Sequence, residues 1–257
     1  KWNPEMAPYI FDQKNGIHII DLHKSIVKID EAADVLKQLA RSGRKVLFVA
    51  TKKQAKDIVA EKAASVNMPY VTERWAGGML TNFPTIRKAV KKMNTIDKMI
   101  EDGTFDTLAK RERLQVTRQR AKLEKNLGSI KDMSRLPSAL FVVDIQKEAN
   151  AVKEANRLNI PVIAMVDTCC DPTPIDYVIP ANDDAAKSVE YITNALCVAI
   201  QEGLNERKLE KEKDAAAEAA EKPATKKLRP RKNAAAETEE VEAAPVEAPK
   251  AEEVNAE

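Results

Sequence analysis

The chain has 257 residues, of which 44% are hydrophobic and 32% are charged, and its formal net charge is +2. A chain of this length can bury a substantial core, and no apolar run approaches the ~18 residues that a membrane-spanning helix requires. The three cysteines, Cys169, Cys170 and Cys197, form neither a Cys-x-x-Cys spacing nor an even disulfide set. A reducing, cytoplasmic location is therefore expected. The chain begins at Lys1 without an initiator Met, which we interpret as a truncation.

The charges are segregated along the chain. Residues 1–135 carry a net charge of +11, of which residues 85–135 contribute +7, whereas residues 136–257 carry −9. A polyanion such as a nucleic acid is therefore expected to face the first half of the chain.

Short apolar runs alternate with amphipathic helical patterns through most of the chain. Runs without polar alternation are typical of strands buried on both faces of a parallel sheet. The alternation predicts right-handed crossovers and an α/β fold with a doubly wound sheet. The expected strands are Ile17–Ile20, Val46–Val49, Tyr70–Thr72, Leu140–Val143, Val162–Val166 and Tyr177–Ile179, and the expected helices span about 25–41, 53–66, 147–157 and 184–204.

This rhythm breaks between Pro84 and Met133, where two long helical patterns follow each other without a strand. Each has one narrow apolar stripe, and Gly103 marks the reversal between them. An antiparallel, coiled-coil-like hairpin that projects from the sheet is therefore predicted. The predicted domains are an α/β core at 1–83 and 134–207, a hairpin insertion at 84–133 and a charged tail at 208–257.

The tail from Lys208 to Glu257 contains only five large apolar side chains. Burying all five returns at most ~15 kcal/mol, whereas ordering the segment costs on the order of 75 kcal/mol. Disorder is therefore predicted for the tail, with Ala215–Ala220 prolonging the preceding helix, because Ala, Glu and Lys favour helix without needing a core.

The most informative loop runs from Arg74 to Asn82 and joins a strand to the first hairpin helix. Gly77 and Gly78 permit positive φ and close approach of the backbone to an anion, and Thr81 and Asn82 can cap the helix. Trp75 offers a stacking face for a base, but a tight turn with this Trp in the core is equally consistent with the local pattern. Lys52 and Lys53 follow a strand, at the sheet edge where ligands bind, and with Arg74 they predict a cationic rim.

Enzymatic signatures are weak. The phosphate-binding glycine loops, the His-Glu-x-x-His motif and the nucleophile elbow are missing from the sequence. Asp144 and Asp167 end buried strands, as the aspartates of a receiver-like enzyme would, although solvation of strand ends explains them more simply. Cys169, Cys170 and Asp171 are candidate metal ligands, but adjacent cysteines make an awkward tetrahedral pair. We expect no catalytic residue, metal or cofactor.

Across residues 1–207 the sequence resembles the bacterial small-subunit ribosomal protein S2 family. The most specific match is Arg74-Trp75 with Gly77-Gly78-Met79-Leu80-Thr81-Asn82. Further matches include Trp2-Asn3-Pro4, Asn15-Gly16-Ile17-His18-Ile19-Ile20-Asp21-Leu22, Asp102-Gly103-Thr104-Phe105, Val166-Asp167-Thr168 and Asn182-Asp183-Asp184.

This resemblance implies a flavodoxin-like sheet with a coiled-coil insertion and a structural, non-enzymatic role in the small ribosomal subunit during translation. It also implies contact with ribosomal RNA and proximity to other small-subunit proteins, ribosomal protein S1 among them. The family's usual Gly-His-Phe-Gly-His-like stretch is absent from the start of this chain.

We therefore predict RNA binding through phosphate contacts and RNA shape, because aromatic residues are only 4% of the chain. A small-molecule enzyme that uses Asp144 and Asp167, and a protein adapter that docks through the hairpin and tail, remain the alternatives. The candidate RNA-binding residues are Trp2, Asn3, Lys52, Lys53, Arg74, Trp75, Gly77, Gly78, Thr81, Asn82, Arg87, Lys88, Lys91, Arg111 and Arg118.

Overall fold

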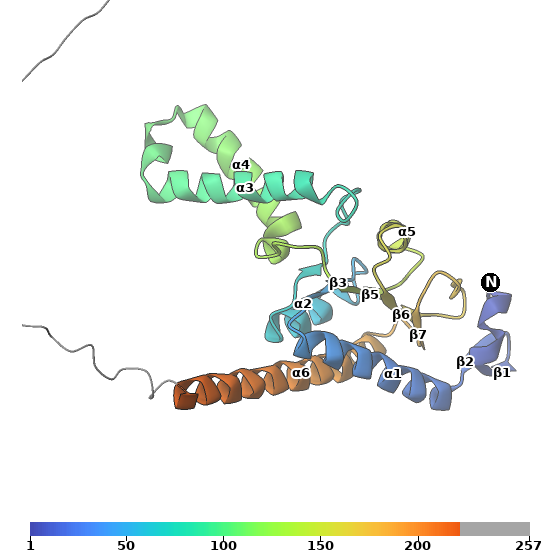
Figure 1. Ribbon diagram of the computed structural model, residues 1–257. Coiled ribbons are helices and arrows are strands. Elements are labelled where there is room, and N and C mark those ends of the chain that lie inside the picture. The colour runs from blue at the N-terminus through green and yellow to red at the C-terminus, as the bar shows by residue number, and fades with distance from the viewer. Residues whose placement is uncertain (222–257) are drawn as a thin grey trace, which may run out of the picture. The chain divides into compact units, whose positions relative to one another are not determined.

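The computed structural model describes residues 1–221 of the chain, with side chains described through residue 213 (Figure 1). Its central element is a five-stranded parallel sheet with the order β4-β3-β5-β6-β7. Counted from β3, this is the 2-1-3-4-5 order of flavodoxin-like folds, so the predicted doubly wound α/β class is confirmed. The strands are β3 (Val46–Val49), β4 (Tyr70–Val71), β5 (Ala139–Val143), β6 (Val162–Val166) and β7 (Tyr177–Pro180).

Helices cover both faces of this sheet. Alternate residues of each strand point to opposite faces, so Phe48 packs with α1, α2 and α6, whereas Leu47 packs with α5 and the loop that follows β4. Figure 1 shows α1 and α6 on one side of the strands and α5 on the other. The helices are α1 (Leu22–Arg41), α2 (Lys56–Ser65), α5 (Ala149–Arg157) and α6 (Ala186–Glu221).

The prediction that Ile17–Ile20 belongs to the parallel sheet is wrong. This segment is β2 of a separate antiparallel hairpin with β1 (Ile10–Lys14), and a short 3-10 helix, η1 (Pro4–Tyr9), precedes the hairpin. Ile17 and Ile19 are 69% and 42% exposed. The overlooked signal was Asn15-Gly16, which connects the strands with positive φ at both residues, as a tight hairpin turn requires.

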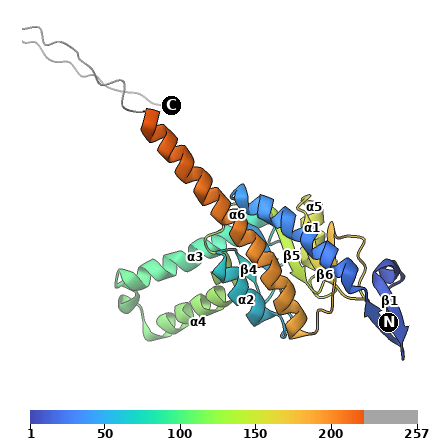
Figure 2. The ribbon, with the colours of Figure 1, turned by 90° about the horizontal axis from the view of Figure 1, so that it is seen from below.

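Two helices without an intervening strand fill the region between β4 and β5. They are α3 (Phe83–Glu101) and α4 (Lys110–Leu127), joined through Gly103 and η2 (Thr104–Thr107) and followed by η3 (Gly128–Ile130). The helices contact each other, with Met93 and Ile96 buried, and Figure 2 shows them beside each other. We name residues 84–133 the arm; its coiled-coil packing and its status as an inserted domain remain predictions.

Helix α6 continues into the segment predicted to be a tail. It extends past the expected helix end at 204 through Glu221, so the helical interpretation of Ala215–Ala220 is confirmed. The division of the chain at Lys208 into core and tail stays a prediction. Ion pairs across the α1–α6 contact explain part of the extension, because Arg41 bonds to Glu206 and Glu210. The disorder predicted for the rest of the tail concerns residues 222–257, which lie outside the described residues.

The other helix ends agree with the predictions to within a few residues. Asp21 caps α1 by accepting a hydrogen bond from the His23 backbone N–H at 3.0 Å, and Gly43 follows the helix with a φ of 74°. The left-handed conformation at that position favours glycine. In residues 1–221, no helix combines the length and the apolar character needed to cross a membrane.

Gly203 allows the close crossing of α1 and α6. A Cβ at this position would lie 2.3 Å from the carbonyl oxygen of Lys37 and 3.0 Å from Cβ of Ala40. Replacing glycine by alanine in a helix normally stabilises by roughly 0.5–1 kcal/mol, but this clash involves the backbone of the neighbouring helix. The two helices would have to move apart.

We therefore expect Gly203→Ala to lower the free energy of unfolding by about 1–3 kcal/mol, measured by urea denaturation. Gly77→Ala is the matched control, because a Cβ there would meet no atom within 4 Å. An equal or higher stability of Gly203→Ala would contradict the close-packed crossing.

Candidate nucleic-acid interface

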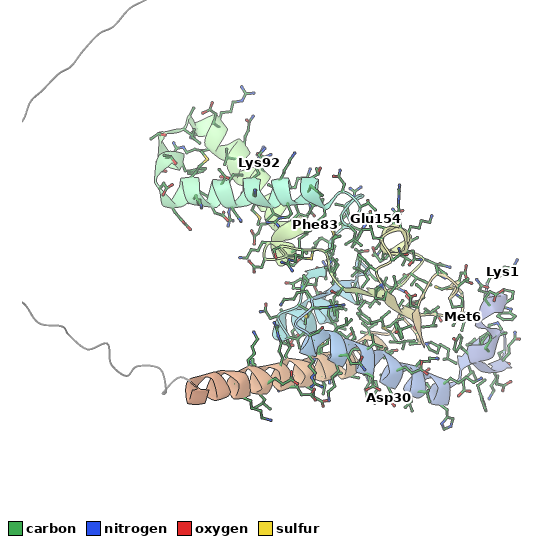
Figure 3. The ribbon with its side chains drawn as sticks, in the orientation of Figure 1. Lys1, Met6, Asp30, Phe83, Lys92 and Glu154 are labelled. Atoms are coloured by element: carbon green, nitrogen blue, oxygen red, sulfur yellow. The ribbon has the colours of Figure 1, made fainter. Side chains whose placement is uncertain are left out.

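The loop between β4 and α3 is organised around one carboxylate, that of Glu154 on α5. Its Oε1 accepts hydrogen bonds from the Trp75 indole N–H at 3.1 Å and from the Gly78 N–H at 2.7 Å. Its Oε2 accepts from the N–H groups of Leu80 and Thr81 at 3.0 and 3.1 Å, and from the Thr81 hydroxyl at 3.1 Å. We name this arrangement the Glu154 clasp. Figure 3 shows Glu154 on the side of the sheet from which the arm extends.

The clasp favours the ionised form of Glu154. Burial raises the pKa of this carboxyl, but the hydrogen bonds from Thr81, Trp75, Gly78 and Leu80 together lower it by more, so the pKa lies below its ordinary value. Hydrogen bonds to a charged acceptor are stronger than those between neutral groups. The clasp therefore links the α/β core to the loop that leads into the arm.

The clasp changes the interpretation of the predicted loop residues. The loop does bind an anion through its backbone, but that anion is internal to the chain. Trp75 is 9% exposed and packs in the core, so the core alternative holds and its ring is not a free stacking face. Only Gly78 of the two glycines has positive φ, at 82°. Asn82 occupies the N-cap position of α3 without a capping bond from its side chain.

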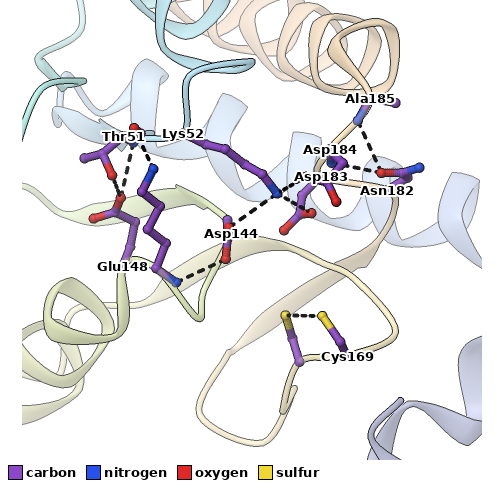
Figure 4. Close-up of polar contacts among 11 residues, drawn as sticks. Thr51, Lys52, Asp144, Glu148, Cys169, Asn182, Asp183, Asp184 and Ala185 are labelled. Carbon is purple, nitrogen blue, oxygen red and sulfur yellow. Dashed lines mark hydrogen bonds and ion pairs between the residues drawn. The ribbon is translucent and has the colours of Figure 1, made fainter. Parts of the chain in front are cut away.

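The carboxyl ends of the strands form a second polar cluster, shown in Figure 4. The ammonium of Lys52 lies 3.4 Å from Asp144, 2.9 Å from Asp183 and 2.7 Å from Asp184. Its side chain is only 14% exposed. Lys52 is thus neutralised within the chain, and the predicted cationic rim is reduced to Lys53 and Arg74, both exposed.

Burial and charge act in opposite directions in this cluster. Burial lowers the pKa of Lys52, but its bonds to Asp184 and Asp183 outweigh this and the pKa lies above its ordinary value. Burial raises the pKa of Asp183, which is 3% exposed. The carboxylates of Asp167, Asp183 and Asp184 lie within 4.8 Å of one another, close enough to share a cation. The Lys52 ammonium already supplies a positive charge to two of them.

Asp144 and Asp167, the candidate residues of the enzymatic alternative, bind groups of the protein itself. Asp144, at a φ of 66°, pairs with Lys52 and accepts a hydrogen bond from the Lys147 N–H at 3.1 Å. Asp167 accepts from the Thr168 N–H at 2.6 Å. Glu148, 3% exposed, bonds to the hydroxyl and the N–H of Thr51, and burial raises its pKa. These contacts brace the sheet edge.

Two predicted residues lie at the start of the chain and contact other parts of it. Trp2 is 39% exposed, and its ring lies 5.0 Å from that of His18. The side chain of Asn3 caps η1 by accepting from the Glu5 N–H at 3.0 Å, and its N–H donates to the Thr168 carbonyl at 2.8 Å. Trp2 and Asn3 therefore contact β2, η1 and the loop after β6, and none of these contacts involves the arm.

The arm carries a dense group of exposed cations, and some of them are held by partners inside the chain. Arg87 bonds to the Ser134 carbonyl at 2.6 Å, and the Arg120–Asp97 and Lys125–Glu73 pairs hold other arm cations. Among the residues whose side chains are described, no carboxylate lies within 4 Å of the remaining predicted cations. These free and exposed cations are Lys53, Arg74, Lys88, Lys91, Arg111 and Arg118.

A groove of about 640 Å³ opens elsewhere, between β2, α1 and α6. Leu22, Ile26 and Tyr191 border it and are 71%, 56% and 72% exposed. Sequence reasoning missed this surface because it assigned β2 to a buried sheet. The lining of the groove is mainly apolar, which makes it a candidate surface for contact with another molecule.

The fold and these surfaces define a class: a doubly wound α/β protein with a basic two-helix arm and an apolar groove, whose strand-end polar groups are bound within the chain. The family model described as Ribosomal protein S2 matches residues 1–203. The chain belongs to the ribosomal protein S2 family, and it is a structural, non-enzymatic ribosomal protein.

Similar proteins named "Small ribosomal subunit protein uS2" occur in several bacteria. The chain is 72% identical over 228 residues to that of Phocaeicola vulgatus, covering 88% of this chain and 82% of the relative. It is 72% identical over 222 residues to that of Parabacteroides distasonis, covering 86% and 80%. It is also 72% identical over 211 residues to that of Porphyromonas gingivalis, covering 82% and 75%.

Removing the charge of the clasp should loosen the base of the arm. Glu154→Gln keeps the shape but turns an amide towards the N–H donors, so we expect the free energy of unfolding at pH 7 to fall by about 1.5–3 kcal/mol. Because the pKa of Glu154 is lowered on folding, its stabilisation is complete above the ordinary pKa of 4.5 and is lost as the pH falls through the lower folded value.

Urea unfolding at pH 7 and below pH 4.5 tests both statements. The stability difference between wild type and Glu154→Gln should shrink in acid. The control is Glu190→Gln, which alters an exposed carboxylate on α6. A difference that stays constant with pH would contradict the role of the Glu154 charge.

Proposed function

We propose that the chain is a structural component of the small ribosomal subunit that binds ribosomal RNA through the arm and the adjoining cations Lys53 and Arg74, and that it acts in the cytoplasm. The observation that supports this proposal best is a set of exposed cations on the arm and next to it that have no carboxylate partner among the described side chains. Family membership supports the same role.

The mechanism is neutralisation of phosphates. Residues 85–135 carry a net charge of +7, and Phe105 is the only aromatic residue between Pro84 and Met133. Successive base stacking needs several aromatic side chains, whereas phosphate contacts need only positioned cations. The arm therefore fixes the protein's register on folded RNA, and RNA shape supplies the specificity.

The arm suits this role as a coiled-coil-like hairpin inserted at 84–133 into an α/β core at 1–83 and 134–207. Met93 and Ile96 are buried, and Asp97 on α3 bonds to Arg120 on α4. Apolar contact along one stripe leaves the rest of each helix available for charge. Lys52, Trp75, Gly78 and the Thr81 hydroxyl contribute indirectly, because their polar groups are bound inside the chain.

The groove between β2, α1 and α6 supplies a second surface, which docks another small-subunit protein. Its lining is mainly apolar, and Lys187, Asp167 and Asn182 at its border provide polar contacts. We assign ribosomal protein S1 as the occupant, inserting an apolar segment. The protein partner and the RNA thus bind to two different surfaces, the groove and the arm.

The triple variant Lys88→Gln, Lys91→Gln, Arg118→Gln should weaken binding to a small-subunit ribosomal RNA fragment. Each lost phosphate contact lowers the slope of log affinity against log salt by about 0.7–0.9, so the slope should fall by about 2–3. Lys153→Gln, Arg157→Gln, Lys187→Gln removes the same charge from exposed positions outside the arm. A flat salt plot for the wild-type protein, or equal loss in both triples, would contradict the proposal.

Tyr191→Glu places a charge at the rim of the groove, where the side chain is 72% exposed and carries little folding energy. We expect at least a ten-fold loss of affinity for purified ribosomal protein S1, with RNA binding unchanged. Leu209→Glu, an exposed apolar position elsewhere on α6, is the control. Retention of full affinity by Tyr191→Glu would exclude the groove as the docking surface.

A further inference from the structure

Two adjacent thiols lie in the loop after β6, where the proposed function does not use them. Cys169 is exposed and Cys170 is 1% exposed, and their sulfur atoms are 3.7 Å apart (Figure 4). Both are free thiols. The two side chains therefore turn towards each other, although neighbours in a chain have other orientations available.

We propose that Cys169 and Cys170 form an oxidation site, at which a hydroperoxide converts the two thiols into a reversible disulfide between adjacent residues. The accessible sulfur reacts first, and the buried sulfur completes the bond. Neither cysteine is among the residues assigned to RNA binding or to the lining of the groove.

The two thiols differ in exposure, and this difference determines which of them reacts first with the oxidant. The exposed Cys169 can meet a hydroperoxide in solvent, whereas Cys170 packs among the buried residues of the α5 face of the sheet. Burial raises the pKa of the Cys170 thiol to about 12, and the protonated thiol is a poor nucleophile. Cys170 therefore does not compete for the oxidant.

The chemistry balances with one peroxide. The Cys169 thiol loses its proton, its thiolate attacks one oxygen of hydrogen peroxide, and the O–O bond breaks. The departing hydroxide takes up that proton, so a sulfenic acid and one water form. The Cys170 sulfur then attacks the Cys169 sulfur, the S–O bond breaks, and the departing hydroxide takes the Cys170 proton as a second water. Two thiols lose two electrons in total, and the peroxide gains them.

The resulting disulfide should be easy to reduce. Adjacent Cα atoms are held about 3.8 Å apart by a trans peptide, whereas disulfides usually span about 4.4–6.8 Å. The strain this imposes favours the dithiol. Cys197 is not an alternative partner, because it is buried on the opposite face of the sheet, among the α1, α2 and α6 residues.

The test treats the full-length protein and intact small subunits with hydrogen peroxide, then labels the remaining thiols with a maleimide under denaturing conditions. Trypsin releases Cys169 and Cys170 together on residues 158–187, and Cys197 separately on residues 188–207. We expect the first peptide to be two hydrogens lighter and unlabelled, and to regain both labels after dithiothreitol. The Cys197 peptide should stay labelled throughout.

Two variants separate the steps. Cys169→Ser should leave Cys170 labelled after peroxide, and Cys170→Ala should leave a sulfenic acid on Cys169 that dimedone traps. Two labels on the treated wild-type peptide would overturn the proposal. So would a sulfinic acid on Cys169, or a disulfide from Cys169 to a second molecule, in place of the internal bond.

Discussion

The Glu154 carboxylate is the interaction on which the arrangement of the two functional parts depends. It lies on α5, which is packed on the sheet, and it accepts five hydrogen bonds from the loop that leads into α3. Without it, three backbone N–H groups and an indole N–H would lack these partners at a partly buried site, which is costly. A single charged acceptor thus joins α5 to the loop at the base of the arm, which also packs on the core through Leu127, Ile130 and Met133.

The charges of the molecule are used in two ways. At the carboxyl edge of the sheet, Lys52 is surrounded by Asp144, Asp183 and Asp184 and holds strand ends together. On the arm, Lys88, Lys91, Arg111 and Arg118 have no carboxylate within 4 Å among the described side chains and remain available to an external polyanion. Net charge along the sequence does not distinguish these two uses, because both involve lysine and arginine in the first half of the chain.

Predictions from local sequence were wrong or undecided where one sequence pattern is compatible with two different structures. Ile17–Ile20 has the apolar composition of a buried strand, yet it forms an exposed hairpin, since the Asn15-Gly16 turn pairs it with β1 before it can reach the sheet. The helix α6 passes its expected end at 204 because helix propensity and ion pairs to α1 support it beyond its buried part. The local sequence is equally compatible with Trp75 as a stacking residue or as a core residue, and its burial shows that it is a core residue.

The sequence by itself determined the parallel strands, the helices between them, the two-helix arm and the family, because hydrophobic periodicity and short motifs are local properties of the chain. Only the tertiary structure decided which charged groups are free. Glu154 follows Gly78 by 76 residues and Asp183 follows Lys52 by 131, and no local pattern specifies such pairs. They form because the crossovers bring distant strand ends and helix faces together, and a charge that has found a partner inside the fold is no longer available to RNA.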